Sequence, residues 1–418
     1  MTPSDVELFT GTYRNHAQAA HAAMLADGAR PRRAYLPGLA PAWLVVGDTD
    51  ARAALLDPRL SKESVLVRDT IADLARAAGL PVPADLSRMF GDSALFRDGE
   101  RHAAQRRLLT GAFTAKRIRD LRPRMERIAL GLLDELPGRA DGGVVDVVEH
   151  LAAPLPLIVI CELLGIPEVD RDRFRRLTVL LMNDDPAVNV PASDEMASFF
   201  ADLIAAKRAA ARHGRDGGDL TTALLDADDT QLIDILFLVF VAGHETTVNL
   251  LGNAMLALLT HPPLWTSVAE HPELAARAVE ETLRWDCPVR TATHRVTLEP
   301  VVYGGVTIPA GELVMVSLDS ANRDPRRWDQ PDRFDLGRDT RGHLAFGHGP
   351  HTCLGAPLGR AEGEIVLRLV TRRFPHAEPG VPVRPGTAAA RWVNRTESTI
   401  MNGLEALPVR LAAGPLAA

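Results

Sequence analysis

Phe346-Gly-His-Gly-Pro-His-Thr-Cys353-Leu-Gly355 is the segment from which the fold and chemistry of this chain are most directly inferred. It presents one cysteine on a glycine-rich loop directly before a predicted helix. A thiolate there lies at a helix N-terminus, where backbone N–H groups and the dipole stabilise negative charge. Gly347, Gly349 and Gly355 have no side chain, which leaves room for a flat ligand to approach the backbone closely. These features suit a cysteine that ligates haem iron from one face; the alternative is a buried structural cysteine after a glycine loop.

A long apolar helix, predicted from Asp229 to Thr260, carries the second chemical feature, Ala242-Gly-His-Glu-Thr-Thr247. A glycine inside a helix costs about 1 kcal/mol relative to alanine. Gly243 therefore indicates either close approach of a flat cofactor or tight helix packing, and the residues after it favour the cofactor. The Thr246 hydroxyl is spaced to compete for the carbonyl of Ala242. Glu245 adds a carboxylate beside this hydroxyl, and such a pair is what proton delivery to bound dioxygen requires.

The cysteine segment resembles the haem-ligand loop of the cytochrome P450 family, and further motifs follow in the family's order over most of the chain. The resemblance implies a mainly α fold with a minor β region: a triangular helical prism with a long central helix over the haem and a cysteine-ligand loop. It implies that haem b is the cofactor and that Cys353 is the proximal metal ligand. It also implies that Glu245 and Thr246 are the catalytic acid–alcohol pair.

The same resemblance implies a set of haem-binding positions. Haem brings two propionate carboxylates into a largely apolar pocket, and these need cationic partners. His102-Ala-Ala-Gln-Arg106 places two basic groups on one helical face. The implied cofactor-binding residues are His102, Arg106, Ala242, Gly243, Arg295, Phe346, His351, Cys353 and Gly355, of which His102, Arg106, Arg295 and His351 are the propionate partners. For Arg106 and Arg295, a surface position is the structural alternative.

Glu281-Thr-Leu-Arg284 places an acid and a base three residues apart on a predicted helix from Glu273 to Trp285. Alone, such a pair is common on solvated helix faces. Downstream, Pro331-Asp-Arg-Phe334 resembles the family's second arginine motif. The resemblance implies that Glu281, Arg284 and Arg333 form a buried ion cluster that holds the cysteine loop in place.

Composition favours one large domain over residues 1–418, because no Pro/Gly/Ser-rich linker, charge run or repeat divides the chain. The formal charge of −7 argues against nucleic acid as a partner. The start has no signal-peptide pattern, and the longest apolar run, 235–242, is much shorter than the ~20 residues of a membrane span. Three widely separated cysteines indicate neither a disulfide framework nor a zinc site. We therefore expect a cytoplasmic monomer without a membrane anchor.

Hydrophobic spacing predicts further helices and a few strands. The predicted helices are 49–56, capped by Thr49, and 100–112, 115–136, 144–164, 170–182, 194–213 and 353–373. Strands are predicted at 43–46 and 313–318, with a hairpin at 301–308. The stretch from about 60 to 95 is predicted to be irregular.

No flavin, iron–sulfur or dinucleotide motif occurs, so electrons are expected from a separate ferredoxin or flavodoxin. Five arginines could form a docking patch on the cysteine side or could be scattered and solvated: Arg107, Arg360, Arg368, Arg372 and Arg373. The expected reaction inserts one oxygen atom from O2 into a small lipophilic secondary metabolite of macrolide, polyketide or terpenoid type, by hydroxylation or epoxidation. Oxidative coupling, a peroxygenase and a haem sensor are the alternatives. Arg290 is expected to face solvent or a propionate, or else a substrate carboxylate.

Overall fold

The structure is a computed structural model that describes residues 11–34, 41–80, 82, 93–181, 186–214, 217–380, 393–396 and 398–411. Its α-helices are α1 (Gly11–Ala26), α2 (Asp48–Leu56), α3 (Ser64–Ala77), α5 (Gly99–Ala112), α6 (Ala115–Arg139), α7 (Pro154–Leu164), α8 (Arg171–Leu181), α9 (Pro186–Arg212), α10 (Leu220–Ala223), α11 (Asp229–Leu259), α12 (Pro262–Glu270), α13 (Leu274–Trp285), α14 (Leu318–Ala321) and α15 (Ala356–Arg373). The short helices are η1 (Ala94–Phe96), η2 (Val148–Ala152), η3 (Glu168–Asp170) and η4 (Gly349–His351). The strands are β1 (Arg32–Ala34), β2 (Ala42–Val45), β3 (Leu60–Ser61), β4 (Val144–Asp146), β5 (Arg295–Thr297), β6 (Val301–Tyr303), β7 (Val306–Ile308), β8 (Leu313–Val316), β9 (Glu378–Pro379) and β10 (Pro408–Arg410).

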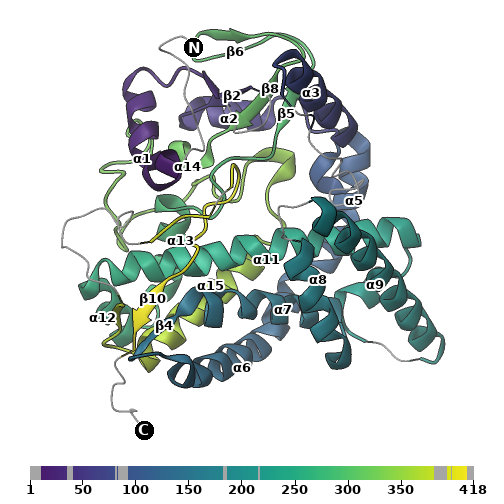
Figure 1. Cartoon of the computed structure of the whole chain (residues 1–418), viewed down its shortest axis with the longest axis vertical. Coiled ribbons are helices and arrows are strands. Elements are labelled where there is room, and N and C mark those ends of the chain that lie inside the picture. The colour runs from purple at the N-terminus through teal and green to yellow at the C-terminus, as the bar shows by residue number, and fades with distance from the viewer. Residues whose placement is uncertain are drawn as a thin grey trace.

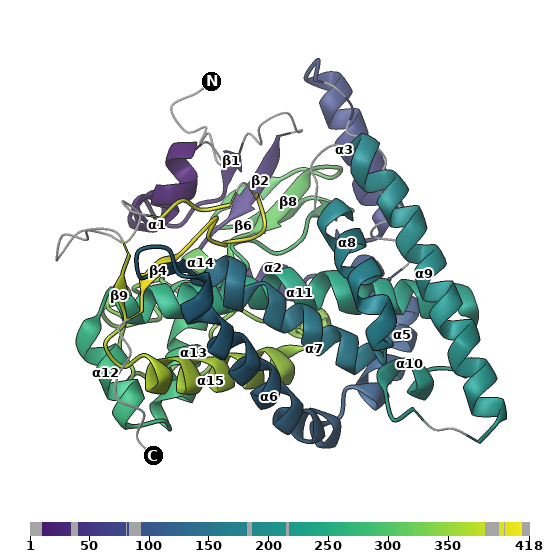
Figure 2. The ribbon, with the colours of Figure 1, turned by 60° about the horizontal axis from the view of Figure 1, so that its bottom comes forward.

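Helix α11 crosses the middle of the molecule, with α6, α7 and α15 on one side and the main sheet with α1, α2 and α14 on the other (Figure 1). It lies centrally because its second half is largely apolar and is buried from Asn249 to Leu259. Within the described residues, α11 alone has the length and composition of a membrane-crossing helix, but more than half of its apolar stretch is buried, as in a core helix. In Figure 2, α15 lies below α11, and α6 runs at an angle to α15. The predicted mainly α fold is confirmed.

Among the described residues, five strands form the main sheet in the order β1-β2-β8-β5-β3. β8 lies at its centre, parallel to β2 and antiparallel to β5. All four of its residues are buried, which explains why Leu313–Val316 is an unbroken apolar run. β3 pairs with β5 at the sheet edge, with Ser61 opposite Val296. This pairing brings the segment after Leu60 beside the segment that begins at Arg295.

Several boundaries differ from the sequence predictions because distant pairing outweighs local spacing. The predicted helix 144–164 begins instead as strand β4, because Val144–Asp146 pairs with β10 from the other end of the chain. The stretch from 60 to 95 contains β3 and the amphipathic helix α3; residues 81 and 83–92 lie outside the described residues. Thr49 does not cap α2, which starts after Gly47 at φ 85°. The hairpin at 301–308 is confirmed as β6 and β7.

Candidate active site

The cysteine loop closes on itself through backbone hydrogen bonds before α15 begins. Cys353 N–H donates to the carbonyl of Phe346 at 2.9 Å. Gly347 and Gly349 have φ of +71° and +75°, a region that favours glycine. At Gly349 a Cβ atom would lie 2.6 Å from Leu56 Cδ2, so this glycine also lets α2 pack on the loop. Turn geometry and packing therefore account for these two glycines directly.

The Cys353 side chain is exposed, whereas Cys161 and Cys287 are buried. Surrounding protein atoms raise the pKa of the Cys353 thiol by desolvation. The backbone N–H groups of Gly355 and Ala356 and, more weakly, Arg106 and Arg360 oppose that shift. The predicted placement of the sulfur at a helix N-terminus is thus confirmed. A thiol with these donors is suited to bind a metal, which deprotonates it outright.

The Phe346 ring is contacted by Arg360, a residue of α15. The Arg360 guanidinium lies over this ring at 4.5 Å from the centroid, and Arg360 Nε donates to Glu280 of α13 at 2.5 Å. Burial favours the neutral acid at Glu280, but hydrogen bonds from His343 and Arg360 outweigh it and lower its pKa to about 2. This ionised carboxylate therefore ties α13 to the cysteine loop.

In α11, the Thr246 hydroxyl donates to the Ala242 carbonyl at 2.6 Å, as the spacing predicts. The next hydroxyl, of Thr247, donates to Gly243 at 2.9 Å. Ala242 is exposed in a helix that is otherwise largely buried, so a surface remains open there. Glu245 is half-buried beside Thr246.

The missing side chain of Gly243 points toward α7, where a Cβ would lie 3.3 Å from Ile160 Cδ1. Helix packing, one of the two explanations from sequence, therefore accounts for this glycine. Gly355, by contrast, is next to the sulfur: a Cβ there would lie 3.7 Å from Cys353 Sγ.

The four residues predicted to bind propionates lie around Asp98 at the start of α5. The rings of His102 and His351 lie 4.1 Å apart, and His351 Nε2 lies 3.8 Å from Asp98 Oδ1. Arg106 donates to the Thr352 carbonyl at 2.7 Å. Arg295 is 4% exposed, which excludes the surface alternative, and its Nη1 is 3.5 Å from two carbonyl oxygens.

Sequence reasoning missed a fifth basic residue at this place, Lys62, which is 3% exposed. Arg295, Asp98 and Arg106 act electrostatically on its ammonium group. In the sequence, Lys62 could have been found only from its position directly after β3. That strand was not predicted, because the stretch from about 60 to 95 was expected to be irregular. We call these residues the cation cluster: Lys62, Arg106 and Arg295, with Asp98, His102 and His351.

The cation cluster fits a cofactor that carries two carboxylates. His102 Nε2 and Arg295 Nε are buried and have no hydrogen-bond partner among the described residues. Burial lowers the pKa of both histidines, that of His351 to about 4, so both imidazoles are neutral at pH 7. Haem offers carboxylates for these groups and iron for the Cys353 sulfur. The residues present therefore fit haem b.

The predicted ion cluster is present, but one of its members is wrong. Glu281 and Arg284 are 0% exposed and joined by two hydrogen bonds of 2.8 Å. The Arg333 side chain is 63% exposed, and only its carbonyl accepts from Arg284. Arg338 completes the cluster instead, with Nε 3.2 Å from Glu281 Oε1. We call Glu281, Arg284 and Arg338 the Glu281 cluster.

Arg290 does not face solvent. It is 2% exposed, and its Nη2 donates to Asn402 Oδ1 at 2.5 Å. The solvent prediction is therefore wrong, because the C-terminal segment, which no local pattern places there, covers this arginine.

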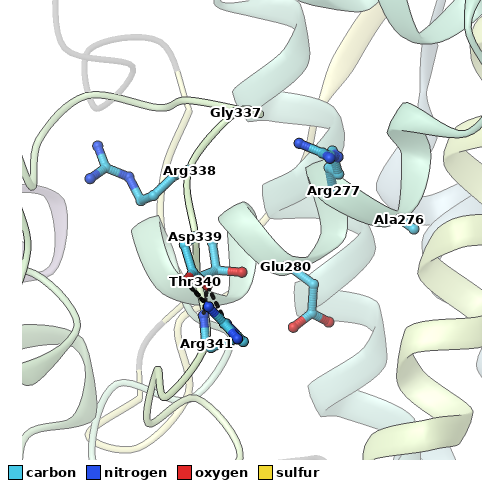
Figure 3. Close-up of a pocket in the computed structure, with 8 residues that line it drawn as sticks. All are labelled: Ala276, Arg277, Glu280, Gly337, Arg338, Asp339, Thr340 and Arg341. Atoms are coloured by element: carbon cyan, nitrogen blue, oxygen red, sulfur yellow. Dashed lines mark hydrogen bonds and ion pairs between the residues drawn. The ribbon is translucent and has the colours of Figure 1, made fainter.

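A hollow between α13 and the loop 337–341 is drawn in Figure 3. Its polar lining includes Arg277, Glu280, Arg338, Asp339 and Arg341, and Arg341 pairs with Asp339. Small-molecule sites for apolar ligands are lined mainly by hydrophobic side chains. This charged hollow does not fit a lipophilic substrate.

Comparisons with known proteins agree with this geometry. The family described as Cytochrome P450 matches residues 177–393. Cytochrome P450 monooxygenase PikC of Streptomyces venezuelae is 42% identical over 89% of this chain and 86% of its own length. 6-Deoxyerythronolide B hydroxylase of Saccharopolyspora erythraea is 39% identical over 88% of this chain and 89% of its own. The tirandamycin C-bound P450 monooxygenase TamI has a similar structure, with a TM-score of 0.83, 34% identity, and coverage of 98% of this chain and 100% of its own.

Proposed function

The chain belongs to the cytochrome P450 family of haem-dependent monooxygenases, and we propose that it inserts one oxygen atom from O2 into a lipophilic secondary metabolite of macrolide or other polyketide type. The substrate class is supported by its similarity to a hydroxylase of 6-deoxyerythronolide B and to a monooxygenase solved with tirandamycin C. Hydroxylation and epoxidation are both within this proposal.

The observation that carries the proposal is the exposed Cys353 thiol at the start of α15, with the backbone donors of Gly355 and Ala356 beside it. Haem b, when bound, supplies oxygen activation and the oxidising power. Cys353 would hold the iron. Phe346 and Gly355 flank the sulfur, and Ala242 on α11 leaves an open surface beside the acid–alcohol pair.

Glu245 and Thr246 would control proton delivery. The Thr246 hydroxyl donates its proton to the Ala242 carbonyl, with 2.6 Å between the two oxygens. The lone pairs of the hydroxyl oxygen are therefore left to accept a hydrogen bond from another donor. Glu245, the neighbouring residue, is half-buried, and we propose that its carboxyl group exchanges protons with solvent. The role of this pair is to hold and move protons.

The partners follow from the same assignment. We propose a cytoplasmic monomer of one domain that takes electrons from a ferredoxin or flavodoxin docking on the cysteine side. Four of the arginines proposed for that docking already contact carboxylates: Arg107 pairs with Glu100, Arg360 with Glu280, Arg368 with Glu126 and Arg373 with Asp134. These pairs reduce the positive charge of the patch, so we expect docking to depend only moderately on salt.

The first test is spectroscopic. The reduced protein with carbon monoxide should show the strongly red-shifted band of thiolate-ligated haem, and Cys353→Ala should abolish it. Cys287→Ala, at a buried cysteine, is the matched control and should retain the band. A wild-type protein without this band would overturn the assignment.

The second test is functional. A screen of lipophilic metabolites by spectral shift identifies a ligand, and turnover is then measured with reduced ferredoxin under air and with peroxide alone. Thr246→Ala should uncouple electron consumption from product because it removes the hydroxyl beside Glu245. Thr247→Ala, whose buried hydroxyl bonds Gly243, is the control. Intact coupling in Thr246→Ala would reject the proton-delivery role, and turnover with peroxide alone would favour a peroxygenase.

A further inference from the structure

Lys62 is one of three lysines in this arginine-rich chain, with Lys116 and Lys207, and its side chain is almost fully buried. It follows directly after β3. Continued one residue beyond the end of β3, the register that pairs Ser61 with Val296 places Lys62 beside Arg295, whose charge acts on the Lys62 ammonium group. Like charges at opposite positions of an antiparallel pair are destabilising. A buried lysine beside a buried arginine therefore needs an anion.

The charged groups of the surrounding elements do not supply enough negative charge. Glu63 is engaged by Arg97 at 3.2 Å, and Asp57 by Arg59 at 2.7 Å. Asp98 is the carboxylate that remains.

Burial disfavours charge on Asp98, but the nearby His351, at 3.8 Å, and hydrogen bonds from Ser61 Oγ and the Lys62 backbone N–H outweigh it and hold its pKa below the usual range. Asp98 is thus ionised. When Lys62 is protonated, the cation cluster therefore holds three cations, Lys62, Arg106 and Arg295, and one carboxylate.

With Lys62 protonated, the three cations exceed the one carboxylate by two positive charges. Two carboxylates would neutralise this excess, and haem carries two. Without Lys62, the same ligand would leave one negative charge uncompensated in a buried place, which is costly.

We propose that Lys62 binds a propionate carboxylate of the haem and is the third cation that neutralises the two propionates together with Arg106 and Arg295. This inference rests on the proposed haem site and adds a cofactor-binding residue to it. Burial and the charge of Arg295 lower the pKa of Lys62 to about 7, against the effect of Asp98. A carboxylate bound beside the ammonium raises that pKa again, so at pH 8 binding of haem is accompanied by uptake of a proton.

The test measures haem retention, which needs no substrate and no turnover. Holoenzyme is mixed with excess apomyoglobin, and transfer of haem is followed by absorbance. Lys62→Met should lose haem about ten- to a hundredfold faster, as expected for loss of one charge-assisted hydrogen bond. Lys62→Arg keeps the charge and should retain haem better than Lys62→Met. Lys116→Met, at an exposed lysine of α6, is the matched control and should behave as wild type.

A second arm identifies the carboxylate. Wild type and Lys62→Met are loaded with the dimethyl ester of iron protoporphyrin IX, which lacks both charges. The difference between the two proteins should then disappear. A difference that persists with the ester would overturn the proposal in favour of a packing role. If Lys62→Met does not fold, Lys62→Gln is compared with Lys62→Arg in the same two assays.

The outcomes separate this inference from the proposed function. If wild type binds no thiolate-ligated haem, the proposed function itself fails. If wild type binds haem and Lys62→Met and Lys62→Gln lose it at the wild-type rate, only the role of Lys62 is rejected. Weaker binding of acidic lipophilic ligands with unchanged haem loss would assign Lys62 to a substrate carboxylate and would also reject the proposal.

Discussion

The Glu281 cluster and the cation cluster both keep cations away from solvent, but they differ in what neutralises them. Arg284 donates to both oxygens of Glu281 and to the carbonyls of Asn322 and Pro331. Arg338 adds a second cation to the same carboxylate and is itself bonded to loop carbonyls. The protein therefore satisfies this cluster internally.

In the cation cluster, Arg295 reaches only two carbonyls at 3.5 Å, and the cluster contains one carboxylate, Asp98. A buried charge cluster that is satisfied by the protein supports the fold, whereas one with excess charge indicates a ligand of opposite charge.

The largest effect is expected at Glu281. Glu281→Gln preserves the shape but leaves Arg284 and Arg338 without a counter-charge, so the free energy of unfolding should fall by about 3–5 kcal/mol. Denaturant unfolding of the holoenzyme measures it. Glu135→Gln, at an exposed ion pair with Arg139, should cost less than about 1 kcal/mol. Equal effects in the two variants would mean that the Glu281 cluster does not stabilise the fold.

Glu362 on α15 belongs to neither cluster: it is a buried acid that stays uncharged instead of being neutralised by a partner. It is 2% exposed, its Oε1 has no partner among the described residues, and burial raises its pKa to about 8. The acid therefore remains protonated in the folded protein at neutral pH. An unfolded glutamate ionises near pH 4.5, so the stability contributed by the neutral acid is complete below that pH and is lost as pH rises toward 8.

Glu362→Gln should remove this pH dependence, because an amide does not ionise. Relative to wild type, its free energy of unfolding should increase by about 1.4 kcal/mol per pH unit from about pH 4.5 to 8, or roughly 3 kcal/mol at pH 7. Unfolding of both proteins is measured across this range. Glu364→Gln, two residues away and paired with Arg122, is the control and should show no such slope. A parallel pH profile for wild type and Glu362→Gln would contradict the buried neutral acid.

Arg295→Gln tests the open cluster. Haem transfer to apomyoglobin should become about ten- to a hundredfold faster, because one propionate partner is lost. The unfolding free energy should fall less than in Glu281→Gln, since relief of repulsion with Lys62 offsets part of the loss. Arg341→Gln, at an exposed arginine, is the control. Unchanged haem retention would remove Arg295 from the site.

The smallest expected effect distinguishes the two arginines of the downstream loop. Arg338→Ala should lower the unfolding free energy by about 1–3 kcal/mol, because it removes bonds to the buried Glu281 carboxylate and to loop carbonyls. Arg333→Ala should change it by less than about 0.5 kcal/mol, since that side chain is exposed. Comparison of the two denaturation midpoints decides which arginine belongs to the Glu281 cluster. A larger loss of stability in Arg333→Ala than in Arg338→Ala would show that Arg333 is the member.

The sequence predicted best those features that depend on neighbours along the chain. The loop before Cys353, the long α11 with its Thr246–Ala242 bond, and the Glu281–Arg284 pair each involve residues a few positions apart. Repeating helical spacing and short motifs are enough to predict them without knowledge of the tertiary contacts. The helix boundaries near Val144 and the missed helix α3 depend instead on partners far away in the chain.

What the sequence alone determined is therefore the family, the helical character and the placement of the sulfur at the start of a helix, because local backbone geometry specifies these. Only the tertiary structure decided that Arg338 replaces Arg333, that Arg290 lies under the C-terminal segment, and that Lys62 lies beside Arg295. Each depends on which distant segments share a buried space. Burial sets the electrostatic cost of a charge, and burial is a property of the folded chain rather than of any short stretch of it.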